Sequence, residues 1–92
     1  MAVRSRLTIR GRVQGVWYRG SMQEEARRRR VAGWVKNEHD GTVVAEVEGE
    51  PSAVEAVTTW ARTGPTGARV DDVQVEWQTP TGAEHGQFAI RR

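Results

Sequence analysis

Apolar and polar residues alternate in several short segments of the chain, which predicts β-strands. Over residues 4–12, Leu7 and Ile9 alternate with polar neighbours, and this period of two is typical of a strand with one buried face. Asp40 and Gly41 favour a tight hairpin turn between two such segments, because this pair tolerates positive φ. Further strands are predicted over residues 33–37, 42–48 and 70–78, with a short last strand over 87–91.

Two segments have the period of a helix instead. Over residues 51–63, apolar side chains recur every three or four positions, with Trp60 expected in the core, Pro51 in the first turn and Gly64 at the end. Residues 21–31 are rich in helix formers, with glutamates early and arginines late, as the helix dipole favours. Because the apolar stripe of this helix is thin, packing of its flanks must supply much of its stability.

The predicted order is strand, helix, strand, strand, helix, strand, followed by the short last strand. Two helices on one face of an antiparallel sheet satisfy this order, which gives an α+β sandwich of the ferredoxin-like βαββαβ class. We find no internal repeat, linker or low-complexity segment, so we expect residues 1–92 to form a single domain.

Composition supports this picture and narrows the classes of function. Hydrophobic residues make up 37% and charged residues 28%, there is no cysteine, and the net charge is only +2. No run approaches the ~20 apolar residues of a membrane span, and Met1 is not followed by an apolar signal segment. We therefore expect a cytoplasmic protein without disulfides or cysteine-bound metal. Its small size and the lack of a long unbalanced apolar stripe favour a monomer.

The most informative segment joins the first strand to the first helix and reads Gly-Arg-Val-Gln-Gly-Val-Trp-Tyr-Arg over residues 11–19. Gly11 and Gly15 free the loop conformation, so that successive backbone N–H groups can point at one centre. The start of a helix adds positive partial charge, and Arg19 adds a planar, permanently charged fork that matches phosphate. The segment predicts a binding site for a phosphoryl group.

A second segment, Gly-Trp-Val-Lys-Asn over residues 33–37, is followed by Asp40-Gly41. In their residues, order and spacing, the two motifs together resemble those of the acylphosphatases. The similarity continues through Glu48-Gly49, through residues 67–70 and to Phe88-x-Ile90 near the end. The resemblance therefore covers essentially the whole chain. It implies a small ferredoxin-like enzyme, without metal or organic cofactor, that hydrolyses acyl phosphates to a carboxylate and phosphate.

By the motif match, Arg19 and the main-chain N–H groups of residues 14–19 would cradle the phosphoryl group, and Asn37 would position the attacking water. The chemistry of these residues agrees, because phosphoryl transfer depends mainly on positioning and on stabilising the equatorial oxygens. Asn37 is a poor base, so geometry and the substrate itself must activate the water. The loop has no nucleophile, and we infer no covalent intermediate. The predicted site comprises catalytic Arg19 and Asn37 and the phosphate-binding loop Gln14, Gly15, Val16, Trp17, Tyr18 and Arg19.

The sequence departs from the family pattern around the first helix. After Arg19, many members carry a pair of hydroxyl residues, whereas this chain has Ser21-Met22. Near the end of the first helix, Arg29-Arg30 stands where members often have Leu-Gly. An arginine where a glycine would end the helix in the left-handed region costs on the order of 1 kcal/mol. These departures affect the stability and rigidity of the loop more than its chemistry.

Other residues have simpler interpretations. Trp17 and Tyr18 are expected to pack or to form a pocket wall, with the Tyr18 hydroxyl as a minor functional candidate, and His39 and His85 to be solvated loop residues. Glu46, Glu48, Asp71 and Asp72 lie on strands or at their ends, and we interpret them as solvent-face or ladder charges rather than as a carboxylate pair.

A different class of function is a ferredoxin-like module that binds RNA or another polyanion, or that regulates without catalysis. The four arginines at 27–30 and a pI near 9.9 motivate it. However, the strands lack the aromatic pattern of sheet-based RNA readers, so we expect an acyl phosphate as partner rather than a nucleic acid or a membrane.

Overall fold

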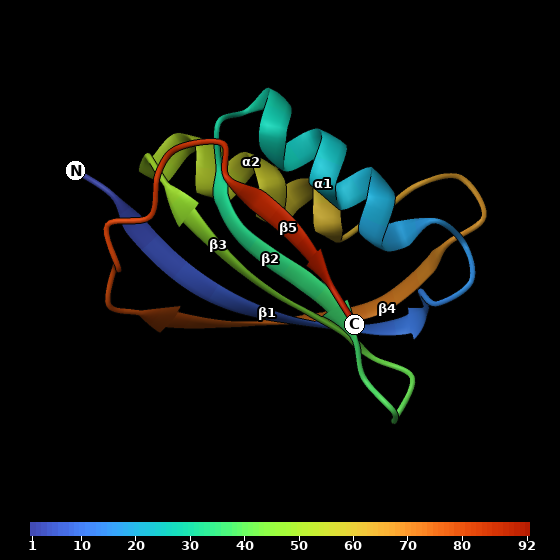
Figure 1. Ribbon diagram of the computed structural model, residues 1–92. Coiled ribbons are helices and arrows are strands. Elements are labelled where there is room, and N and C mark those ends of the chain that lie inside the picture. Colours follow the sequence, from blue (N-terminus) through green and yellow to red (C-terminus); the bar gives the residue numbers. More distant parts are fainter.

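The computed structural model describes residues 1–92 and contains five strands and two helices (Figure 1). Most predicted boundaries agree with it to within two residues. No helix is both long and apolar enough to cross a bilayer. In chain order the elements are β1 (Val3–Arg12), α1 (Tyr18–Arg28), β2 (Ala32–Asn37), β3 (Val43–Gly49), α2 (Pro51–Ala61), β4 (Arg69–Gln78) and β5 (Phe88–Arg91).

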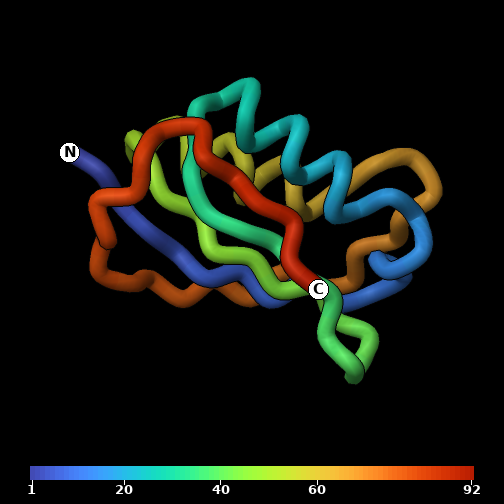
Figure 2. Tube along the Cα trace, viewed as in Figure 1, coloured from blue at the N-terminus to red at the C-terminus, as the bar shows by residue number.

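The sheet has the strand order β4-β1-β3-β2-β5. The ferredoxin-like order is confirmed, and its first four strands are antiparallel neighbours. The fifth strand pairs with β2 in parallel, which makes the sheet mixed rather than wholly antiparallel. Since β4 and β5 occupy opposite edges, residues 79–87 must cross one end of the sheet, as the red part of the tube in Figure 2 shows.

This topology brings the ends of three strands together at one end of the sheet. Both β1 and β2 run antiparallel to β3, so they point the same way, and β5 runs parallel to β2. The carboxyl ends of β1, β2 and β5 therefore meet at one end of the sheet, where the glycine loop leaves β1. Residues that follow β1, end β2 and end β5 can therefore share a pocket, although they are far apart in the sequence.

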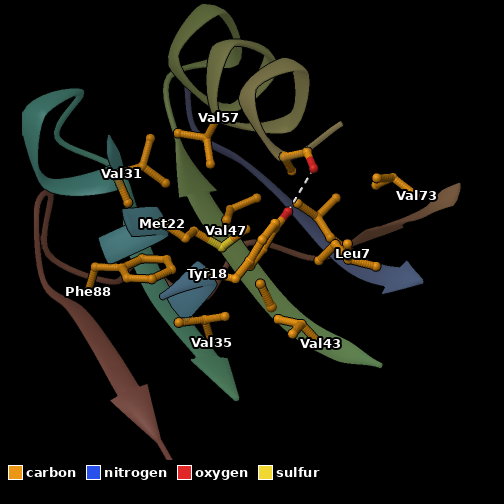
Figure 3. Close-up of a cluster of buried hydrophobic side chains, with 14 of the residues drawn as sticks. Leu7, Tyr18, Met22, Val31, Val35, Val43, Val47, Val57, Val73 and Phe88 are labelled. Carbon is orange, nitrogen blue, oxygen red and sulfur yellow. Dashed lines mark hydrogen bonds between the residues drawn. The ribbon is translucent and has the colours of Figure 1, made fainter. Parts of the chain in front are cut away.

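Both helices cover the same face of the sheet, and the core lies between them and the strands (Figures 1 and 3). Helix α1 contributes Tyr18, Met22 and Ala26, whereas α2 contributes Val54 and Val57. Trp60 is only partly buried and packs against this core, with its ring 5.4 Å from that of Tyr18. The strand alternation is confirmed by the buried set Leu7, Ile9, Val35, Val43, Ala45 and Val47.

Helix α1 begins and ends three residues earlier than predicted, at Tyr18 instead of Ser21 and at Arg28 instead of Val31. No acidic residue then lies in its first turn. Glu25 is instead buried in the middle of the helix, where it forms ion pairs with Arg28 and Arg29. Burial alone would raise the pKa of this carboxyl, but hydrogen bonds from the two guanidinium groups outweigh it and lower the pKa.

The end of α1 confirms the expected strain at Arg30. Its φ is 59°, in the left-handed region, and it is the residue after the C-cap Arg29. The N–H of Arg30 donates to Arg27 O at 3.1 Å, and that of Val31 donates to Ala26 O at 2.8 Å. These two bonds form a Schellman motif, in which glycine is the favoured residue at the position of Arg30.

We expect Arg30→Gly to stabilise the protein by about 1 kcal/mol, because glycine adopts this φ without steric cost. The exposed Arg30 side chain forms no ion pair that would be lost. Arg30→Ala removes the same side chain and keeps the strain, so it should stay close to the unmodified protein. Urea denaturation of the three proteins checks the expectation, and equal stability of the glycine and alanine variants would contradict it.

Glu48 is a buried anchor for the crossing segment. It is not a solvent-face charge, but it lies opposite Arg4 in the β1–β3 ladder and pairs with it, so the ladder interpretation holds. Only 1% of the residue is exposed, on the sheet face opposite the helices. Its carboxylate accepts hydrogen bonds from Arg4 Nη1 at 2.8 Å, from Thr81 N and Oγ1 at 2.9 Å, and from the N–H groups of Gly82 and Ala83 at 2.8 and 3.1 Å. These bonds hold the segment that leads into β5.

The environment of Glu48 predicts an acid-sensitive fold. Burial alone would raise its pKa, but the hydrogen bonds from Thr81, Arg4 and Gly82 prevail and lower the pKa from 4.5 to about 2. A lowered pKa stabilises the folded state fully above pH 4.5, and this contribution, roughly 2–3 kcal/mol, is lost as the pH falls from there toward 2. Urea denaturation from pH 7 to pH 2 measures it. In Glu48→Gln the protein should be less stable at pH 7 and its acid-dependent loss smaller; parallel pH profiles would refute the role.

Candidate active site

A pocket of about 450 Å³ lies at the end of the sheet where β1, β2 and β5 terminate. The glycine loop and the first turn of α1 form most of it, and the ends of β2 and β5 complete it. Its lining residues are Val13, Gly15, Trp17, Tyr18, Arg19, Gly20, Asn37 and Ile90. Both predicted catalytic side chains, Arg19 and Asn37, therefore lie in one pocket.

The loop bends into the helix through two residues in the left-handed region. Gly15 has a φ of 75°, and Trp17, the N-cap of α1, has a φ of 63°. The sequence has no serine, threonine, aspartate or asparagine at this cap, and no side chain hydrogen-bonds to the helix start. The first N–H groups of α1 therefore keep their donor capacity and lie at the positive end of the helix dipole.

Arg19 lies in the first turn of α1 and is partly exposed. Its Nη1 donates to the carbonyl oxygen of Arg91 at 3.2 Å, which links the loop to the end of β5. No carboxylate is paired with it. The guanidinium therefore has most of its donors free to bind an anion, without a competing negative charge.

Asn37 is the last residue of β2, and its backbone is fixed by pairing with Val43 of β3. Its Oδ1 is buried and has no hydrogen-bond partner. A buried oxygen of this kind is uncommon in folded proteins, because it loses its bonds to water without replacing them. Here the side chain also lines the pocket, so a molecule bound there can supply the missing donor.

The side chain of Gln14 makes a contact that the loop motif alone does not predict. Its Nε2 donates to the carbonyl oxygens of Glu38 and Thr42, at 2.8 and 2.9 Å. Its side chain thus fastens the glycine loop to the β2–β3 turn, directly after Asn37, and does not line the pocket. The sequence motif could flag Gln14 but not this contact, which depends on the turn being folded.

Other predicted residues divide between core, loop and pocket wall. The ring of Tyr18 borders the pocket, but its hydroxyl donates to Ala61 O at 2.7 Å (dashed in Figure 3), and burial raises its pKa. That hydroxyl is therefore a structural group. Val16 packs against the core and does not line the pocket, and both histidines are exposed as expected.

The sequence model of the acylphosphatase family matches residues 5–90. An acylphosphatase of Anaeromyxobacter dehalogenans is 54% identical over 97% of this chain and 95% of its own length. One from Thermococcus kodakarensis is 55% identical over 89% and 90%. The crystal structure of acylphosphatase from Bacillus subtilis superposes with a TM-score of 0.91 at 34% identity, covering 98% of this chain and 99% of that one. The chain belongs to the acylphosphatase family.

Proposed function

We propose that this pocket hydrolyses the carboxyl–phosphate bond of acyl phosphates by direct in-line attack of water. Arg19 and the N–H groups of the glycine loop hold the phosphoryl group, and Asn37 orients the water. The observation that carries the proposal is that the uncapped start of α1, the uncompensated Arg19 cation and the unpaired Asn37 oxygen share one pocket.

The phosphoryl side of the site acts through fixed positive charge. In the transition state, negative charge spreads over the equatorial oxygens of the transferred group. The N–H groups at the start of α1 and the planar Arg19 fork are donors that need little reorganisation to meet those oxygens. Binding requires Arg19 to exchange its 3.2 Å contact with the Arg91 carbonyl for a charged phosphoryl oxygen, which is a stronger acceptor.

The water side of the site relies on the Asn37 amide. Its Oδ1 accepts a hydrogen bond from the water and so directs a lone pair toward phosphorus. As the new P–O bond forms, the bond between phosphorus and the acyl oxygen breaks, and the carboxylate leaves with the electron pair. The water proton passes to a phosphoryl oxygen. Because the carboxylate is a good leaving group, no side chain has to act as a general acid.

Gln14 is a positioning residue for this reaction. It joins the loop that binds the phosphoryl group to the turn that follows Asn37, through two hydrogen bonds below 3 Å. Water and phosphorus are therefore held at a set distance by the fold, as an in-line attack requires.

The polyanion-binding alternative receives less support from the arrangement of its residues. Within the basic run 27–30, two arginines pair with the buried Glu25. The Trp34 ring has Arg6 at 5.7 Å and Arg91 at 4.7 Å, which leaves little of its surface for a base to stack on.

A single domain that acts as a cytoplasmic monomer stays our expectation.

The direct test is hydrolysis of acetyl phosphate and benzoyl phosphate by the purified protein in the presence of a metal chelator. We expect turnover of both, with inorganic phosphate as a competitive inhibitor because it occupies the same cradle. Absence of turnover on both substrates would refute the proposed function. Salt-sensitive binding of single-stranded RNA without hydrolysis would instead favour the alternative.

A further inference from the structure

Trp17 is the least buried aromatic residue at the pocket. Its side chain lines the cavity, yet 69% of the residue is exposed to solvent. Its φ of 63° also places it in the left-handed region, which a bulky side chain rarely occupies. A large apolar side chain that is this exposed contributes little to the core, and its contacts are with the pocket.

The indole of Trp17 packs against the neighbouring Gly20. Gly20 lies inside α1 and its φ is not in the left-handed region, so its backbone does not require glycine. A Cβ at this position would lie 2.4 Å from both Cε2 and Cζ2 of Trp17. The indole therefore occupies the space beside the first turn of the helix that a side chain at position 20 would need.

Ile90 supplies a second apolar group at the same pocket. It is 40% exposed, comes from β5, and lines the cavity together with Trp17. The adjacent Arg91 carbonyl is the group that Arg19 contacts, so Ile90 is held close to the phosphoryl cradle. The cavity, at about 450 Å³, is within the range of pockets that bind whole small molecules rather than a single ion.

We propose that Trp17, seated on Gly20, and Ile90 form a subsite for the acyl half of the substrate, and that it selects aromatic or extended apolar acyl groups. The inference rests on the proposed function, because the phosphoryl group must occupy the adjacent cradle. An aromatic acyl group can stack on the exposed indole and bury apolar surface against Ile90. An acetyl or carbamoyl group is too short to gain from either contact.

The test compares selectivity, defined as the ratio of kcat/KM for benzoyl phosphate to that for acetyl phosphate. We expect Trp17→Ala to lower this ratio about 10-fold, which is the size of a lost aromatic contact with its buried area. Ile90→Ala should lower it about 3-fold for the smaller apolar group. The matched control is Trp77→Ala, because Trp77 is also 69% exposed but lies on β4 and does not line this pocket.

A second measurement tests the seat of the indole without any assay of activity. Alanine favours a helix over glycine, so Gly20→Ala should raise the melting temperature by about 3 °C when Trp17 has already been changed to alanine. In the presence of Trp17, the same change should lower it, because the Cβ displaces the indole. Selectivity should fall in Gly20→Ala as it does in Trp17→Ala.

The possible failures are distinct. Equal losses on the two substrates in Trp17→Ala, or a Gly20→Ala effect that does not depend on Trp17, would overturn the subsite and leave the proposed hydrolysis standing. Absence of turnover of either substrate by the unmodified protein would overturn both. A fall in selectivity in Trp77→Ala would show that the ratio reports stability instead of acyl binding, and would also overturn the subsite.

Discussion

Arg19→Ala should lower kcat/KM for acetyl phosphate by about 1,000-fold, because it removes the only positively charged side chain that lines the pocket. The loss should include weaker inhibition by phosphate, since phosphate uses the same guanidinium. The fold should be unaffected: the single side-chain hydrogen bond of Arg19, to the Arg91 carbonyl, is exposed. Steady-state kinetics, circular dichroism and thermal melting together measure the effect.

The chain offers a matched control for Arg19. Arg27 lies on the same helix and also donates to a carbonyl of β5, from Nη2 to Phe88 O at 3.4 Å, but it does not line the pocket. Arg27→Ala should therefore keep its activity within a few-fold. Arg19→Lys retains the charge and loses the planar fork, so its activity should fall between those of the alanine variant and the unmodified protein. Equal activity of Arg19→Ala and Arg27→Ala would exclude Arg19 from the site.

Local patterns were sufficient for the strands and for the pairing of the two motifs. Alternation around Leu7 and Ile9 predicts the buried face of β1, because strand period is a property of neighbouring residues. The predicted start of α1 is three residues too late, because the cap of this helix has no sequence signal. Ser21 is a residue type that favours helix starts, but the N-cap is Trp17, whose side chain makes no hydrogen bond to the helix.

Features that depend on distant partners could not be predicted in this way. Glu48 is buried only because Arg4 and the N–H groups of the β4–β5 segment meet it, and these come from opposite ends of the chain. The parallel pairing of β5 with β2 has the same origin. So does the apolar part of the pocket, in which Trp17 and Ile90 become neighbours of one cavity only after the sheet has formed.

Asn37→Ala should separate the water side of the site from the phosphoryl side. We expect kcat to fall by about 100- to 1,000-fold, the range for losing one preorganised group that acts on the reacting atoms. Inhibition by phosphate should change by less than about 3-fold, because the donors of the loop and Arg19 remain. Arg19→Ala should give the opposite pattern for phosphate. Parallel measurements of kcat and of the phosphate inhibition constant distinguish the two roles.

The stability of the same variant tests why the Asn37 oxygen is unpaired. Its Oδ1 is buried without a partner, and removing such an atom relieves a desolvation penalty of about 1–3 kcal/mol. Asn37→Ala should therefore melt no lower than the unmodified protein, although it is nearly inactive. Lys36 directly precedes Asn37 and has only a partly exposed 3.6 Å contact to Glu38, so Lys36→Ala should change neither property by much. If Asn37→Ala were both active and less stable, the amide would be a turn residue. An inactive, equally stable protein that still binds phosphate would mean that the fold keeps this oxygen unpaired for the attacking water.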